Sequence, residues 1–101
     1  MSGVNNPYRY QYETVAASAT EQVLGGTGAI GDYVHRLIVT VGTALTGTVT
    51  LLDGSTSIAI VPASGTVGVY SVELNMVSAS GAWKVTTGAG ATVVGVGIFS
   101  A

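Results

Sequence analysis

The sequence predicts an all-β protein: a single antiparallel β-sandwich or jelly-roll-like barrel of about seven to eight short strands with an extended N-terminal arm. Short runs rich in Val, Ile and Thr recur along the chain, glycine and serine separate them at the spacing of sandwich strands, and helix signals are nearly absent. A length of 101 residues predicts one domain. We place the arm at residues 1–12 and the sandwich domain at residues 13–101.

The predicted strands are the β-branched runs that fit a half-buried pleated surface. They are Tyr12–Ser18, Tyr33–Val41, Gly47–Leu52, Ser57–Val61, Val67–Met76, Ala82–Thr87 and Thr92–Phe99.

The clearest turn is Asp53-Gly54, which lies between two of these runs and predicts a hairpin with a type I′ turn. The run Val67–Met76 alternates in polarity. Its alternation predicts one face toward the core, made of Tyr70, Val72, Leu74 and Met76.

In the last run, Gly95 and Gly97 share a face with Val93 and Phe99. Missing side chains there let another backbone or an aromatic ring approach closely, and a tight bend is the alternative. Trp83 alternates with Val85, which favours a buried core position. On an exposed loop, its ring would instead be able to stack on a sugar.

The composition argues against several classes of protein. Only 8% of residues are charged, against roughly 25% in an ordinary soluble domain, and the net charge is −2. Scattered basic residues do not neutralise a row of phosphates, so we expect no nucleic-acid partner. With no cysteine and one histidine, neither a disulfide framework nor a multi-histidine metal site is expected. The N-terminus has no signal-peptide pattern, and the charge-free run 54–72 is too rich in glycine and serine for a membrane span.

Two short patterns resemble catalytic motifs. Gly26-Thr-Gly28-Ala-Ile-Gly31 has the spelling of a dinucleotide-binding turn, but a predicted strand follows it where that motif needs a helix, so we expect a loop. His35 could act as a general base oriented by Asp32 or Glu73. Residues 32 and 35 point to opposite faces of a strand, and nothing else supports a catalytic constellation. We therefore expect a structural histidine, no catalytic residue and no enzyme activity.

The five acidic residues are spread through the chain without the spacing of a calcium loop. We expect no cofactor and no resident metal. A weak cation site at a subunit junction remains a minor alternative, since a fold can bring distant carboxylates together.

The arm is the main candidate binding segment. Its alternation places Tyr8, Tyr10 and Tyr12 on one side of an extended chain, with Arg9 beside them. Tyrosine and arginine are enriched at protein interfaces, so these four residues are the predicted interface. In the alternative, the tyrosines belong to a first strand that packs on the protein's own core.

Four segments resemble parts of small β-rich structural proteins of tailed bacteriophages, of the capsid decoration or cement type. They are Pro7–Tyr12, Gly31–Leu37, Thr50–Gly54 and Gly81–Gly88. The resemblance spans most of the chain and implies a structural role in the virion without fixing the location. We expect a decoration protein on the capsid surface, made in the cytoplasm of the bacterial host. It carries over no binding residue.

These observations together predict a virion protein that stabilises a phage capsid through oligomerisation and docking of its arm. The expected partners are its own copies, as a homotrimer, and the major capsid protein, with no nucleic acid and no membrane. A thin core and few surface charges leave apolar area for such contacts. The alternative is a tail-fibre or baseplate component that binds a host glycan.

Overall fold

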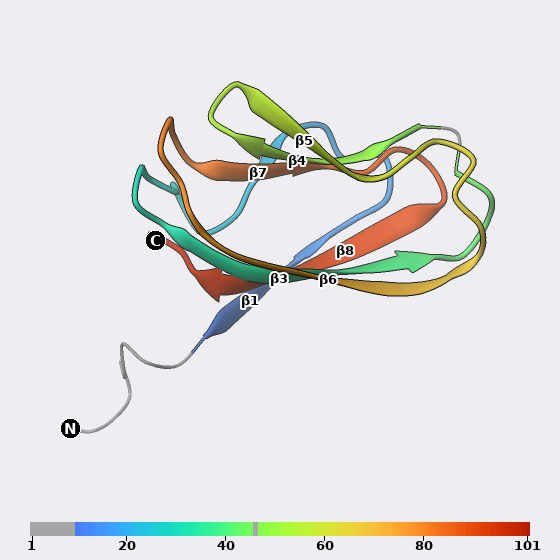
Figure 1. Ribbon diagram of the computed structural model, residues 1–101, viewed down its shortest axis with the longest axis horizontal. Helices are drawn as coiled ribbons and strands as arrows, with labels where there is room; N and C mark the ends of the chain where they lie inside the picture. The colour runs from blue at the N-terminus through green and yellow to red at the C-terminus, as the bar shows by residue number, and fades with distance from the viewer. Residues whose placement is uncertain (1–9, 46) are drawn as a thin grey trace.

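The computed structural model describes residues 10–45 and 47–101, which form two antiparallel four-stranded sheets packed face to face (Figure 1). Within these residues there is no helix long and apolar enough to cross a membrane. The strands are β1 (Gln11–Val15), β2 (Gln22–Val23), β3 (Tyr33–Val41), β4 (Val49–Asp53), β5 (Thr56–Val61), β6 (Gly68–Val77), β7 (Trp83–Thr86) and β8 (Ala91–Ile98).

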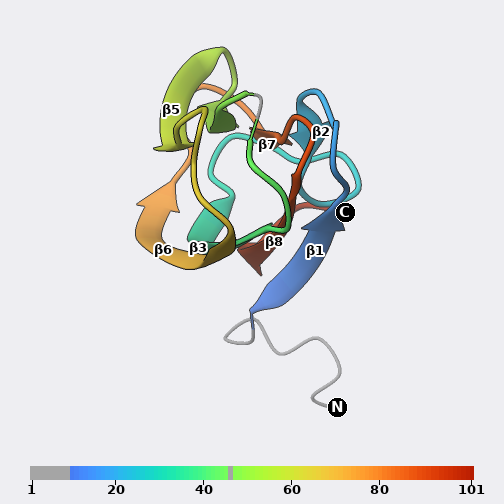
Figure 2. The same ribbon diagram turned by 90° about the vertical axis from the view of Figure 1, so that its right-hand side faces the viewer.

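The strand order is β1-β8-β3-β6 in one sheet and β2-β7-β4-β5 in the other. The chain therefore crosses between the two sheets several times. The edge strands are β1 and β6 in the first sheet and β2 and β5 in the second. Figure 2 shows β1 and β2 along one side of the sandwich and β5 and β6 along the opposite side.

The predicted all-β class is confirmed, and each of the seven predicted strands corresponds to an observed one. The first begins at Gln11, inside the range assigned to the arm. Strand β2 was not predicted, because its two residues are too few to show alternation. It pairs with β7 and completes the second sheet.

The core lies between the sheets and consists mainly of branched aliphatic side chains. Trp83 is its largest member, with 1% of its surface exposed, and its indole Nε1 donates a hydrogen bond of 2.8 Å to the carbonyl of Asp32. The prediction of a buried Trp83 is thus confirmed. The predicted core face of β6 is confirmed for Tyr70, Leu74 and Met76, which pack against this cluster.

Glycines in β8 make room for the packing of larger side chains. A Cβ on Gly95 would lie 3.0 Å from a methyl group of Leu24, and one on Gly97 would lie 2.9 Å from the ring of Phe99. Both distances are too short for ordinary van der Waals contact. The expected close approach of an aromatic ring to this face is confirmed at Gly97.

The β4–β5 hairpin exists, but the predicted type I′ turn is wrong. Its two-residue loop is Gly54-Ser55, because Asp53 still pairs with Thr56. Type I′ needs positive φ at both loop positions, and of the two only Gly54 has it, with φ 59°. Glycine at the first position is the signature of a type II′ turn. Asp53 instead accepts hydrogen bonds from the backbone N–H groups of Ala79, Ser80 and Gly81.

Candidate functional site

The outward surface of the β1-β8-β3-β6 sheet, called here the outer face, carries most of the exposed large apolar side chains. Seven such residues occur in the described part of the chain. Two of them, Ile30 and Val67, lie in loops, and the other five lie on the outer face: Tyr10, Tyr12, Val69, Val77 and Ile98.

Strand register arranges the outer face in rows that cross the sheet. One row contains Tyr12 on β1, Val96 on β8, Arg36 on β3 and Glu73 on β6. Side chains directly opposite on neighbouring strands lie close enough to contact one another. Each row is therefore a continuous band of side chains.

The next row contains Ile98, Tyr33 and Val77, and the ring of Tyr10, which precedes β1, lies 5.9 Å from the ring of Tyr33. A third row contains Thr14, Val94, Ile38 and Ser71. The three rows together form an aromatic and aliphatic surface, and Arg36 and Glu73 place polar groups in its middle row.

Two β-bulges bring the polar side chains together in the middle of the outer face. Between Val34 and Arg36 the register shifts against both neighbours of β3. On the β6 side of this irregularity, Asn75 has a positive φ of 52°. Because the bulge adds a residue, His35 and Arg36 both lie on the outer face, whereas strict alternation would separate them.

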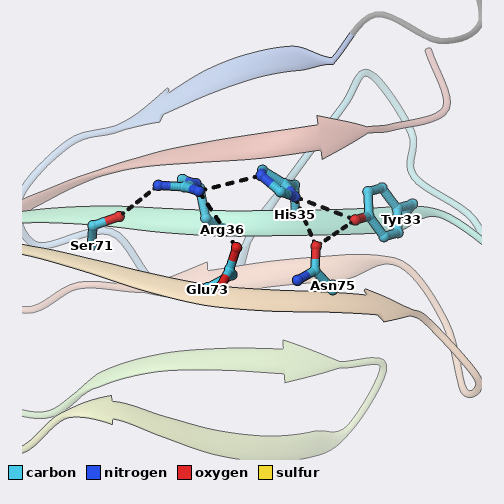
Figure 3. Close-up of polar contacts among 6 residues, drawn as sticks. All are labelled: Tyr33, His35, Arg36, Ser71, Glu73 and Asn75. Atoms are coloured by element: carbon cyan, nitrogen blue, oxygen red, sulfur yellow. Dashed lines mark hydrogen bonds and ion pairs between the residues drawn. The ribbon is translucent and has the colours of Figure 1, made fainter.

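We name the resulting group the bulge cluster: Tyr33, His35, Arg36, Ser71, Glu73 and Asn75 (Figure 3). The amide oxygen Oδ1 of Asn75 lies 2.7 Å from the Tyr33 hydroxyl and 2.8 Å from Nδ1 of His35. That oxygen only accepts hydrogen bonds, so both partners donate to it.

Arg36 closes the other end of the bulge cluster. Its guanidinium lies 3.4 Å from Nε2 of His35, 3.1 Å from Oγ of Ser71 and 3.7 Å from a carboxylate oxygen of Glu73. A guanidinium only donates, so Nε2 of His35 accepts and the proton of the ring is on Nδ1. The ion pair with Glu73 balances the charge of Arg36, and the bulge cluster carries no net charge.

The ring of Tyr10 lies over this cluster. It stacks on the imidazole of His35 with centroids 4.5 Å apart and an interplanar angle of 20°. It also lies 5.9 Å from the ring of Tyr33. Desolvation, the Tyr10 side chain and the charge of Glu73 all raise the pKa of Tyr33, which keeps its hydroxyl neutral as a donor.

Two of the four predicted interface residues thus lie on the outer face. Tyr10 is 50% exposed and Tyr12 is 74% exposed, so neither is a core residue. The alternative in which these two rings pack inside the sandwich is wrong. Tyr8 and Arg9 lie outside the described residues.

The contacts of His35 do not support a hydrolytic mechanism. Its described hydrogen-bond partners are Tyr33, Arg36 and Asn75, and none of these is an acid or a serine or threonine nucleophile. Asp32 does not reach His35. Its carboxylate accepts bonds from the N–H of Ala29 and from the N–H and hydroxyl of Ser100.

The described residues contain no group of three His, Cys, Asp or Glu side chains placed to hold a metal ion. A shallow hollow of about 360 Å³ lies near the Gly42 and Gly90 loops, and glycine, alanine and threonine line it. Such a lining offers neither an acid, a base nor a metal ligand.

Sequence reasoning found the tyrosines because they alternate, but it missed the bulge cluster. The sequence carried one signal of the bulge. Val34 and Leu37 are both apolar and both buried, although residues three apart in a regular strand point to opposite faces. No family model, no curated protein and no solved structure matches the chain. The surface chemistry of the outer face therefore carries the functional inference.

Proposed function

We propose that this chain is a structural virion protein that decorates and stabilises the capsid of a tailed bacteriophage. The observation that carries the proposal is the gathering of five exposed large apolar residues on one sheet face, around a tyrosine, histidine and arginine cluster. Large apolar patches on soluble domains mark interaction sites, and tyrosine and arginine dominate the binding energy at interfaces.

The proposed fold is a jelly roll. Eight strands divided into two four-stranded antiparallel sheets, in the order β1-β8-β3-β6 and β2-β7-β4-β5, support this assignment. Jelly rolls are frequent in viral capsid proteins and in lectins. Because one fold hosts many functions, the assignment adds to the proposal without deciding it.

In the proposed role the outer face and the N-terminal arm, including Tyr8, Arg9, Tyr10 and Tyr12, dock on the major capsid protein. The subunit acts without enzymatic turnover, as a homotrimer on the capsid surface, after synthesis in the host cytoplasm. The neutral bulge cluster supports a protein partner over nucleic acid, since phosphate binding needs unpaired positive charge.

A second candidate is glycan binding by a tail-fibre or baseplate component. The half-exposed ring of Tyr10, stacked on His35 next to the amide of Asn75, favours it, because sugars bind to aromatic faces flanked by polar groups. Trp83 contributes nothing to it, since the indole is buried.

The test uses virions that lack the native protein. We expect the purified chain to bind these particles, and a variant without residues 1–9 to bind less tightly while keeping the same melting temperature. The deletion leaves β1, which starts at Gln11, intact. No binding of the full chain to the particles would contradict the proposal, and binding to a glycan array instead would favour the second candidate.

A further inference from the structure

The core is covered to different extents at the two sides of the sandwich, where the edge strands of the two sheets lie. On the side of β1 and β2, the carboxylate of Glu13 accepts bonds from the Gln22 side chain and from the N–H of Gly25. Because Glu13 lies on β1 and Gln22 lies on β2, these contacts join the two sheets along that side.

The side of β5 and β6 is less completely covered. Six apolar residues pack on the core while remaining partly exposed, and only Ala19 lies elsewhere. The other five lie on the two edge strands: Ile58, Ile60, Tyr70, Leu74 and Met76.

Among residues 10–45 and 47–101, β1 and β6 each pair with a strand on one side only. An edge strand leaves alternate N–H and C=O groups unpaired, and proteins guard such edges with lysine, proline or bulges. Strand β6 contains no lysine, arginine or proline. Its bulge at Asn75 leaves a regular stretch from Gly68 to Glu73, which is close in length to β1 at the opposite edge.

We propose that β6 of one subunit pairs with β1 of a second copy of this chain, so that the sheet continues from subunit to subunit. This inference rests on the proposed assembly into a closed ring and names the contact that forms it. A ring of three needs a heterologous contact, in which two different surfaces meet. The two free edges of one sheet meet that requirement.

The geometry of the sheet is consistent with this pairing. Neighbouring strands are antiparallel throughout β1-β8-β3-β6, so β6 runs opposite to β1. A rotation axis parallel to the strands preserves strand direction. The β6 strand of one copy and the β1 strand of the next are then antiparallel, as in the rest of the sheet.

The area reaches the lower limit for a specific contact. The six regular residues of β6 span about 20 Å, and the molecule is up to 26 Å across, so the side offers on the order of 500 Å² per copy. The total of about 1,000 Å² is the least that a specific protein interface needs.

Engineered disulfides test the contact, because the chain has no cysteine of its own. Thr14 and Ser71 lie at opposite ends of one row of the outer face, and both are exposed. Continuing the sheet without a register step brings Thr14 of one copy beside Ser71 of the next. On oxidation, Thr14→Cys/Ser71→Cys should therefore form covalent dimers and trimers and nothing larger. Thr14→Cys/Val69→Cys tests the same pairing with the register of the two strands shifted by two residues.

The matched control is Thr14→Cys/Ser57→Cys, since Ser57 is equally exposed but lies on β5 of the other sheet. It should stay at one chain. Cross-linking of Ser71→Cys alone would reveal a two-fold contact between β6 strands and overturn the head-to-tail pairing. The head-to-tail pairing would also be overturned if neither designed pair cross-links although the protein sediments as a ring.

Hydrogen exchange gives the second measurement on the unmodified chain. Amides of β6 that point away from β3 should exchange rapidly in dilute protein and slowly at concentrations where the ring forms. Protection that arises only when capsid particles are added would assign this edge to the shell and overturn the proposal. Because particle binding is measured separately, a failed cross-link leaves the proposed decoration role standing.

Discussion

The two sheets are similar on the inside and different on the outside. Both contribute buried valine and leucine to one core. The outer face of the β1-β8-β3-β6 sheet exposes tyrosine, valine and isoleucine, whereas the outward positions of β2-β7-β4-β5 carry Thr50, Ser57, Lys84 and Thr86. Leu52 points outward there too but is only 8% exposed.

The polar sheet therefore has the surface of an ordinary solvated domain. Its Lys84 pairs with Glu21 at 3.5 Å, both in contact with solvent, which contributes little to stability. The apolar sheet retains exposed area that folding alone does not require. We therefore propose the apolar sheet as the interaction surface, with the other sheet holding it in place.

The largest expected effect is on docking. We expect Tyr10→Ala/Tyr12→Ala to weaken particle binding by about a hundredfold or more, since each buried ring contributes roughly 1–3 kcal/mol. Thr50→Ala/Ser57→Ala, on the other sheet, is the matched control and should bind normally. Affinity for particles and the melting curve of each variant give the answer. Equal weakening by both pairs would remove the distinction between the two faces.

The next effect is on stability. Gly54→Val should destabilise the fold by about 1–2 kcal/mol or more, because a β-branched residue resists positive φ and its Cβ would lie 3.0 Å from the backbone of Ser80. Urea unfolding measures the loss. The folded fraction should still dock normally, because this turn belongs to the polar sheet. A variant as stable as the native chain would show that the turn tolerates another conformation.

Asp53 gives a smaller, pH-dependent effect at the same hairpin. Desolvation acts to raise the pKa of its carboxyl, but three backbone N–H donors outweigh it and hold the pKa below the ordinary value. The stabilisation is therefore complete above about pH 4, the ordinary pKa of aspartate, and is lost as the pH falls through the lowered pKa.

We expect Asp53→Ala to lose about 1–3 kcal/mol at pH 7, the range for hydrogen bonds that leave unpaired donors. Unfolding free energies of both proteins from pH 7 to pH 2.5 test this. The difference between them should shrink below about pH 4, and a difference that stays constant would mean that the carboxylate charge is irrelevant.

Much of the fold could be predicted from the sequence because alternation is a local signal. Val69 and Tyr70, for example, face opposite sides as their order requires. Two features could not be predicted. The two residues of β2 are too few for a period, and the pairing of β2 depends on β7, which is far away in the sequence.

The candidate site was predictable only in part. The alternation placed Tyr10 and Tyr12 on one side of the chain, and both are exposed on the outer face, but the bulge cluster depends on a change of register within β3. Alternation from Tyr33 would place Leu37 outward, yet Leu37 is fully buried. The three-dimensional pairing shows that His35 and Arg36 share a face, where His35 meets Asn75 and Arg36 meets Glu73 of β6.

The smallest effect concerns the bulge cluster itself. Glu73→Gln should change the free energy of unfolding by less than about 0.5 kcal/mol, because its ion pair with Arg36 is exposed. It should also lower the pKa of Tyr33 toward the ordinary value, since the charge of Glu73 is one cause of the raised pKa. Tyrosine ring-carbon NMR across alkaline pH, assigned with Tyr33→Phe, measures the shift. An unchanged titration would mean that Glu73 does not act on this hydroxyl.

The most direct test of the central claim is an electron cryomicroscopy map of the intact virion at side-chain resolution. We predict density for this chain on the capsid, with Tyr10, Tyr12 and the bulge cluster buried against a partner and with Thr50, Ser57 and Lys84 facing solvent. A map in which the β2-β7-β4-β5 sheet contacts the shell while the outer face remains in solvent would contradict the account.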